Sequence, residues 1–267
     1  MSASLNDMGQ ALAWSGSDLI AMVWVYYDES GEYGPTGNLL NMSIGACVSP
    51  LDHWKPFGAA WKAALAAEGV AYFHMTDFEA WRPPFDFKLP DGSRDKGKHN
   101  RLLNSLLDLM VGHAEHLAGF AEGNLISQDA SRAHKLALEG CVLAAVTHVV
   151  HDLWNYYQRP INLVFGKQNH FSYADVMKYI ELYDWGEGRG RIGTVSVAEP
   201  QDVPELQAAD ILAYEMAKIQ RDRPTRYPFN RLLAGAKARN IPLTLKWGPF
   251  TKISDRVSAR LSGGTSS

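Results

Sequence analysis

The chain contains 267 residues, of which 46% are hydrophobic and 21% charged, a composition typical of a soluble globular protein with a sizeable core. No apolar run approaches the roughly 18 residues that a membrane-spanning helix needs, and the first residues lack the basic and apolar regions of a secretory signal. The two cysteines, Cys47 and Cys141, each lie in an apolar stretch, which predicts reduced thiols in the core. We therefore expect a cytoplasmic protein with no membrane partner.

The first predicted element is a strand in residues 22–31, which read MVWVYYDESG. Valine, tryptophan and tyrosine fill most positions before Asp28, and these residue types favour a buried strand. Ser30 and Gly31 then predict a turn. The adjacent acids Asp28 and Glu29 come at the carboxyl end of the strand, a position that suits divalent-metal chemistry. A strand that simply enters a polar turn, with Asp28 bonded to nearby amides, is the alternative.

Hydrophobic periodicity divides the rest of the chain into further strands and helices. A second strand at 39–48 is expected to pair with the first as a hairpin. The later predicted strands are 116–124, 161–165 and 192–198, and the predicted helices are 50–67, 100–112, 127–157, 173–183 and a last helix that starts at 202–205 and ends before Pro224. This order predicts an α/β protein with a mixed sheet of about five strands flanked by helices. We expect a flexible leader at 1–17, a single domain at 18–255 and a flexible tail at 256–267.

The last predicted helix carries an acid within a face of small and apolar residues. That face comprises Leu206, Ala209, Ala213 and Ala217. Asp210 lies among them and is expected to point toward the sheet or along its rim. A carboxylate beside a packed face needs a partner because its burial alone is costly. A metal ion shared with Asp28 would supply that partner, and so would a buried arginine or lysine. Gln207, one turn earlier, is a candidate to position a phosphate or a water.

The segment FHMTDFE contains His74, Asp77 and Glu79 within six residues. Imidazole and carboxylate groups at this density are typical of a metal or acid–base site. Capping of a short helix by Thr76 or Asp77 is the structural alternative.

Basic residues are concentrated near the end of the chain. Between Lys218 and Arg260 there are eleven lysines or arginines and only two aspartates, although the formal net charge of the whole chain is −3. The candidate nucleic-acid contacts in this region are Arg221, Arg223, Arg226 and Arg231. A basic region of this kind can bind phosphates, and a solvated surface is the alternative.

Three segments together, DESG, FHMTDFE and LQAADILAY, resemble a bacterial and phage family of unknown function, numbered 3800, over roughly residues 22–220. That family is placed in the ribonuclease H-like superfold, in which a first-strand acid and a last-helix acid meet at one metal site. The resemblance implies that Asp28 and Asp210 hold the metal, with Glu29, Glu79 or His74 assisting. The chain departs from the superfold at the end of the fourth predicted strand, where FGKQNH contains no acid. Glu199 or Asp77 is a candidate substitute for that acid.

The sequence therefore predicts a divalent-metal-dependent nuclease that hydrolyses phosphodiester bonds in RNA or DNA. Mg²⁺ or Mn²⁺ would be held by Asp28 and Asp210, and the candidate catalytic residues are Asp28, Glu29, Glu79 and Asp210. The missing fourth-strand acid favours an alternative, a degenerate ribonuclease H-like module that binds nucleic acid or a protein partner without catalysis. An enzyme acting on a small phosphorylated substrate has less support, because GEGRGR lacks the strand-to-helix context of a phosphate-binding loop.

Overall fold

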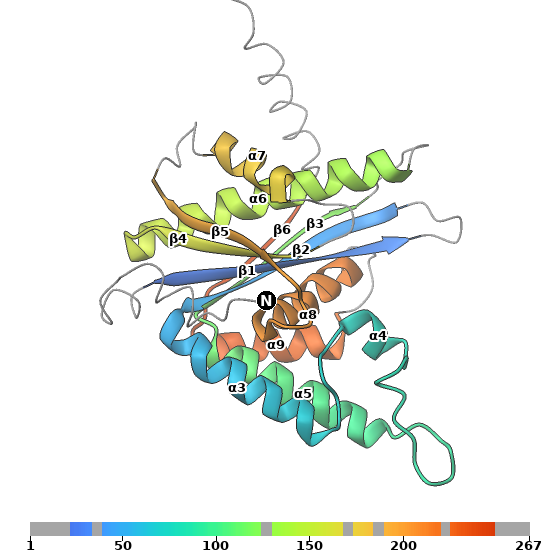
Figure 1. Ribbon diagram of the computed structural model, residues 1–267. Coiled ribbons are helices and arrows are strands. Elements are labelled where there is room, and N and C mark those ends of the chain that lie inside the picture. Colours follow the sequence, from blue (N-terminus) through green and yellow to red (C-terminus); the bar gives the residue numbers. More distant parts are fainter. Residues whose placement is uncertain are drawn as a thin grey trace, which may run out of the picture.

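A six-stranded mixed sheet forms the centre of the computed structural model, which describes residues 22–33, 39–123, 130–167, 173–183, 190–219 and 225–248 (Figure 1). The strands are β1 (Val23–Tyr33), β2 (Leu39–Pro50), β3 (His116–Gly123), β4 (Ile161–Gly166), β5 (Ile192–Ala198) and β6 (Leu243–Trp247), arranged in the order β5-β4-β1-β2-β3-β6. The β1–β2 and β2–β3 pairs are antiparallel, whereas β1–β4, β4–β5 and β3–β6 are parallel. The parallel strands β1, β4 and β5 therefore point toward the same edge of the sheet.

Helices cover both faces of this sheet. In the described part of the chain they are α3 (Leu51–Ala67), α4 (Met75–Glu79), α5 (Lys96–His113), α6 (Ala130–Tyr157), α7 (Tyr173–Tyr183), α8 (Pro204–Ile219) and α9 (Tyr227–Ala238). Helices α6 and α7 lie on one face, and α3, α5, α8 and α9 lie on the other (Figure 1). Each face contributes to its own hydrophobic core.

Strand β1 is apolar along most of its length because both of its faces are covered. Trp24 and Tyr26 belong to the core beneath α3 and α8, whereas Val25 and Tyr27 belong to the core beneath α6. Side chains alternate along a strand, so Asp28 continues the series on the α8 face and Glu29 lies on the opposite face.

Helix α8 approaches the sheet closely at Gly45 of β2. A Cβ atom at Gly45 would lie 2.6 Å from the backbone nitrogen of Ala213 and would also collide with the carbonyl oxygen of Ala209. Gly45 is the β2 partner of Asp28 in the antiparallel register. The glycine therefore brings the helix that carries Asp210 against the part of the sheet that carries Asp28.

The α/β class and the five predicted strands are confirmed, and the sheet has one strand more than expected. Strand β6 and helix α9 both lie in the region that the sequence indicated only as a basic flank. The segment FHMTDFE contains the short helix α4, whose N-cap is His74 without a side-chain hydrogen bond, so the predicted capping by Thr76 or Asp77 is not formed. The predicted leader and tail lie outside the described residues. No helix in the described ranges is long and apolar enough to cross a membrane.

Candidate active site

Asp28 lies in the middle of β1, level with the carboxyl end of β4. Ser30 and Gly31 pair with β2, so the turn predicted after Asp28 and Glu29 is not formed there. The Asp28 side chain is 6% exposed. It rests over Gly166, the last residue of β4, where an added Cβ would collide with Asp28 Oδ1 and come within 3.4 Å of Cγ of Pro200. Asp28 therefore lies next to both the end of β4 and the loop that joins β5 to α8.

Asp210 faces this region from α8 and is 4% exposed. Its Oδ2 atom accepts a hydrogen bond of 2.7 Å from the backbone N–H of Met75, the first residue of α4. Burial raises the pKa of Asp210, and the nearby His74 imidazole and the Met75 N–H oppose that rise. Asp77 raises the pKa further by charge repulsion. Asp210 is thus a buried carboxylate in direct contact with the FHMTDFE segment.

His74 and Asp77 form a hydrogen-bonded pair beside Asp210. The His74 Nδ1 atom lies 2.8 Å from Asp77 Oδ2, and Arg82 lies 3.4 Å from the other oxygen of Asp77. Unlike Asp210, the His74 side chain is about half exposed. The structure therefore brings together Asp210, His74 and Asp77, three of the residues predicted from the sequence.

Gln207 is buried beside this site and forms hydrogen bonds with both of its side-chain amide atoms. Its Oε1 atom accepts hydrogen bonds from Trp61 Nε1 and from the backbone N–H of Phe73, each 2.9 Å long. Its Nε2 atom donates to the carbonyl oxygens of Pro200 at 3.0 Å and Gln201 at 3.2 Å. Both ends of the amide are occupied, so Gln207 holds the two loops beside the carboxylates rather than reaching a phosphate or a water as expected.

Glu79, a predicted catalytic acid, binds Arg226, a predicted nucleic-acid contact. The Glu79 Oε1 atom lies 2.5 Å from the Arg226 guanidinium, which also lies 3.5 Å from the fully buried Glu215. Arg231 forms hydrogen bonds of 2.7 Å with both carboxylate oxygens of Asp108. These two arginines therefore fasten α9 to its neighbours. The other predicted contacts, Arg221 and Arg223, lie outside the described residues.

The end of β4 carries no acid, and the nearby Glu199 binds a lysine. Glu199 follows β5, and its Oε1 atom lies 2.5 Å from Nζ of Lys167, the residue after β4. Both side chains are more than half exposed. This ion pair offsets the positive charge of Lys167 near the carboxylates. It also engages Glu199, which was predicted to replace the missing acid of the fourth strand.

The carboxylates fit one class of metal ion better than others. Across the described ranges, no group of three or more His, Cys, Asp or Glu side chains is arranged to hold a metal ion. A closed protein cage of the kind that binds Zn²⁺ or Ca²⁺ is therefore not formed by these residues. Mg²⁺ is often held by one or two carboxylates, with water and substrate phosphates completing its coordination. That second arrangement requires no more protein ligands than the two predicted ones, Asp28 and Asp210.

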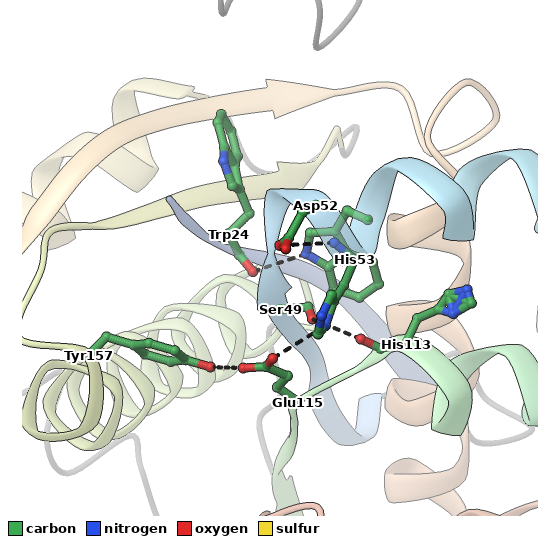
Figure 2. A network of polar contacts seen from close by, with 8 residues as sticks. Trp24, Ser49, Asp52, His53, His113, Glu115 and Tyr157 are labelled. Carbon is green, nitrogen blue, oxygen red and sulfur yellow. Dashed lines mark hydrogen bonds and ion pairs between the residues drawn. The ribbon is translucent and has the colours of Figure 1, made fainter. Parts of the chain in front are cut away.

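A second polar region lies at the opposite end of the sheet, in a cleft of about 670 Å³ (Figure 2). Glu115 lies 3.3 Å from His53 Nδ1 and accepts a hydrogen bond from Tyr157. Ser49 Oγ also lies 3.3 Å from His53 Nδ1 and donates to the carbonyl oxygen of His113 at 2.8 Å. A Ser–His–acid relay needs the two different ring nitrogens of the histidine. Because Ser49 and Glu115 share one nitrogen, this network joins secondary-structure elements and does not form a nucleophilic triad.

No protein-family model matches the chain, and a search of curated proteins finds no match. The resemblance to the family numbered 3800 stays a prediction from the three sequence segments.

Proposed function

We propose that the protein is a divalent-metal-dependent nuclease of ribonuclease H-like fold that hydrolyses phosphodiester bonds in RNA or DNA. The observation that carries the proposal is the placement of two buried carboxylates, Asp28 on β1 and Asp210 on α8, on the same covered face of the sheet. Gly45 pairs with Asp28 and contacts the backbone on either side of Asp210. Hard carboxylate oxygens are the ligands that Mg²⁺ and Mn²⁺ prefer.

The sheet topology supports the ribonuclease H-like part of the proposal. Five of the strands follow the order β5-β4-β1-β2-β3, with an antiparallel β1–β2–β3 meander and parallel β4 and β5. The family resemblance implies a mixed sheet of about five strands flanked by helices, with one acid on the first strand and one on the last helix. Strand β6 extends the sheet beyond β3, away from the proposed site.

The surroundings of Asp210 also favour a cation. Among the described residues, no lysine or arginine forms an ion pair with Asp210, so the predicted alternative of a buried basic partner lacks support. Burial raises the pKa of Asp210 although the Met75 N–H and the His74 imidazole oppose the rise, so these two groups do not fully offset the cost of burying its charge. A divalent ion shared with Asp28 would offset this charge.

Residues of the chain have distinct roles in the proposed reaction. Asp28 and Asp210 would hold Mg²⁺ or Mn²⁺, which when bound lowers the pKa of water and stabilises charge on phosphate oxygens. The contact of His74 Nδ1 with Asp77 favours a proton on Nδ1, because an ionised carboxylate can only accept. The Nε2 atom of His74 is then able to accept a proton from an attacking water.

The test compares the wild-type protein with Asp28→Asn and Asp210→Asn on single-stranded and double-stranded RNA and DNA, with Mn²⁺ and with a chelator. We expect cleavage only with metal and a loss of about 100-fold or more in each variant, the range typical for removing a group that acts in the transition state. Glu181→Gln on the exposed surface of α7 is the matched control and should retain full activity. Full activity in both aspartate variants would exclude this assignment.

The second candidate function is a ribonuclease H-like module that binds nucleic acid or a protein partner without catalysis. The specific observation that favours it is Gly166, which places no acid at the end of β4 where the superfold commonly has one. This function requires binding that survives both chelation and the two aspartate substitutions. The same set of variants therefore distinguishes the two functions.

A further inference from the structure

The loop that joins α4 to α5 extends away from the body of the protein (Figure 1). Part of it forms a small hairpin, in which Lys88 pairs with Arg94 in an antiparallel bridge and Leu89 N–H donates to the carbonyl oxygen of Ser93 at 2.8 Å. Leu89, at the turn, is 43% exposed. We call residues 80–101 the basic arm, because they contain six lysines or arginines against three aspartates.

The basic residues at the tip of the arm have two aspartates beside them in sequence, Asp91 and Asp95, whose carboxylates accept hydrogen bonds from Ser93 and from the backbone N–H of Lys98. Lys88, Arg94 and Lys96 are exposed, and within the described residues none of them forms an ion pair with a carboxylate. Like charges directly opposite each other on paired strands are destabilising. The Lys88–Arg94 bridge is such a pair, and a polyanion would relieve the repulsion.

Part of the arm is held in a fixed arrangement rather than left as a solvated charge run. The Arg94 guanidinium lies 4.9 Å from the centre of the Trp81 ring, which itself stacks on His99 at 4.1 Å. His99 is buried and binds the carbonyl oxygen of Phe78 in α4 at 3.0 Å. The side chain of Arg94 is thus supported by a stack that reaches into the core.

The basic arm directly follows α4, the helix whose first residue contacts Asp210. Arg82, in the arm, pairs with Asp77, which binds His74, and the next residue, Met75, donates its N–H to Asp210. A nucleic-acid strand that runs along the arm from its tip to Arg82 would therefore reach the segment that contacts Asp210. Arg226 and Arg231, the contacts predicted from the sequence, are already bound to acids.

We propose that the basic arm is a phosphate-binding surface that holds the backbone of a nucleic acid beside the Asp28–Asp210 site. This inference rests on the proposed function for its substrate class. It assigns binding to Lys88, Arg94 and Lys96, and it leaves hydrolysis to the carboxylates.

The test measures binding of fluorescein-labelled single-stranded and double-stranded oligonucleotides at a series of salt concentrations, by fluorescence anisotropy in the presence of a chelator. The arm variant is K88E/R94E/K96E, and K88Q/R94Q/K96Q is a milder form. The matched control is R159E/K178E/K237E, which makes the same change in charge at exposed positions outside the arm. Circular dichroism establishes that each variant is folded.

We expect the arm variant to bind at least about tenfold more weakly, and the slope of log K against log salt to fall by about one for each lost phosphate contact. The control should bind like the wild type. Equal binding by the arm variant and the wild type would overturn the inference. This is the result expected if the arm binds an acidic protein partner instead of a nucleic acid. The proposed function is tested separately, by the cleavage assay with Asp28→Asn and Asp210→Asn. If the arm variant binds nucleic acid like the wild type and still cleaves it with metal, the inference about the arm fails and the proposed function is retained.

Discussion

The carboxylate of Asp28 occupies the space into which a side chain at Gly166 would project. A Cβ at Gly166 would lie 3.2 Å from Asp28 Cγ and would collide with Oδ1. At position 166 an acid is therefore excluded for a steric reason: this position next to Asp28 has to be a glycine if Asp28 is to keep this conformation. An acid at 166 and the observed placement of Asp28 exclude each other.

Gly166→Ala is expected to displace the Asp28 carboxylate without changing any ionisable group. We predict a loss of about 1–3 kcal/mol in the free energy of unfolding, the usual cost of forcing an extra methyl group into a packed site. Metal-dependent cleavage should fall at least about tenfold, because a displacement of about 1 Å can cost that much or more. Denaturant unfolding and the cleavage assay measure the two effects.

Gly112→Ala in α5 is the control for this substitution. Its Cβ would meet only Arg239, at 3.9 Å, so the free energy of unfolding should stay the same or rise by up to about 1 kcal/mol. If Gly166→Ala behaves like Gly112→Ala in both assays, then the contact between Gly166 and Asp28 does not control the site.

Parts of this arrangement were predictable from the sequence because they depend on local periodicity. The apolar run that ends at Asp28 predicted β1, and the small residues around Asp210 predicted the face of α8 that packs on the sheet. The role of Gly45 was not predictable, because it depends on which residue of α8 arrives at that point of the sheet. The ion pair between Glu79 and Arg226 likewise joins residues that are far apart in sequence, so their charges carried no signal of pairing. Strand β6 is short and only half-buried, and LTLKW gives little periodic signal on its own.

Gln207 is expected to act on stability and on the position of the loops rather than on chemistry. Gln207→Leu would leave the Phe73 N–H and Trp61 Nε1 without their acceptor, and each unsatisfied buried group costs about 1–3 kcal/mol. We predict a loss of about 2–5 kcal/mol in the free energy of unfolding, measured by chemical denaturation. Gln207→Glu keeps the acceptor but places a buried carboxylate against the carbonyl oxygens of Pro200 and Gln201, so it should lose at least as much at neutral pH. Equal stability of the wild type and Gln207→Leu would show that these hydrogen bonds contribute nothing net.

Glu205, buried between α8 and α3, is expected to make the protein less stable as the pH rises. Burial raises the pKa of Glu205 from 4.5 to about 7, and Lys62 opposes the rise. The native state keeps this proton at pH values where the unfolded chain has released it. The stability that the protonated group contributes is therefore fully present below a pH of about 4.5 and is lost as the pH rises through about 7, with a total of about 3 kcal/mol.

Glu205→Gln removes this titration while keeping the size of the side chain. Compared with the wild type, the variant should gain stability progressively between about pH 5 and about pH 8, as measured by denaturant unfolding at several pH values. Glu181→Gln on the exposed surface of α7 should show no such gain. A difference between Glu205→Gln and the wild type that does not vary with pH would contradict the assignment.

Arg226 is expected to stabilise the protein mainly by offsetting the charge of Glu215. Glu215 is fully buried, and none of the described residues forms a hydrogen bond with its carboxylate oxygens, but the Arg226 guanidinium lies 3.5 Å away. Burial raises the pKa of Glu215 to about 7, and Arg226 opposes that rise. Arg226→Leu should therefore cost about 3–5 kcal/mol of unfolding free energy above neutral pH, the usual effect of removing one partner of a buried ion pair.

The double variant Arg226→Leu with Glu215→Leu separates this pairing from the contact between Arg226 and Glu79. Replacing both members of a buried pair by apolar residues is often neutral, so the double variant should recover most of the stability that Arg226→Leu loses. Glu79→Gln is the control, and it should cost much less because the Glu79 side chain is 26% exposed and can be solvated. If the double variant is as unstable as Arg226→Leu alone in denaturant unfolding at the same pH, the cost arises from Glu79 or from lost packing, and the buried charge of Glu215 is not its source.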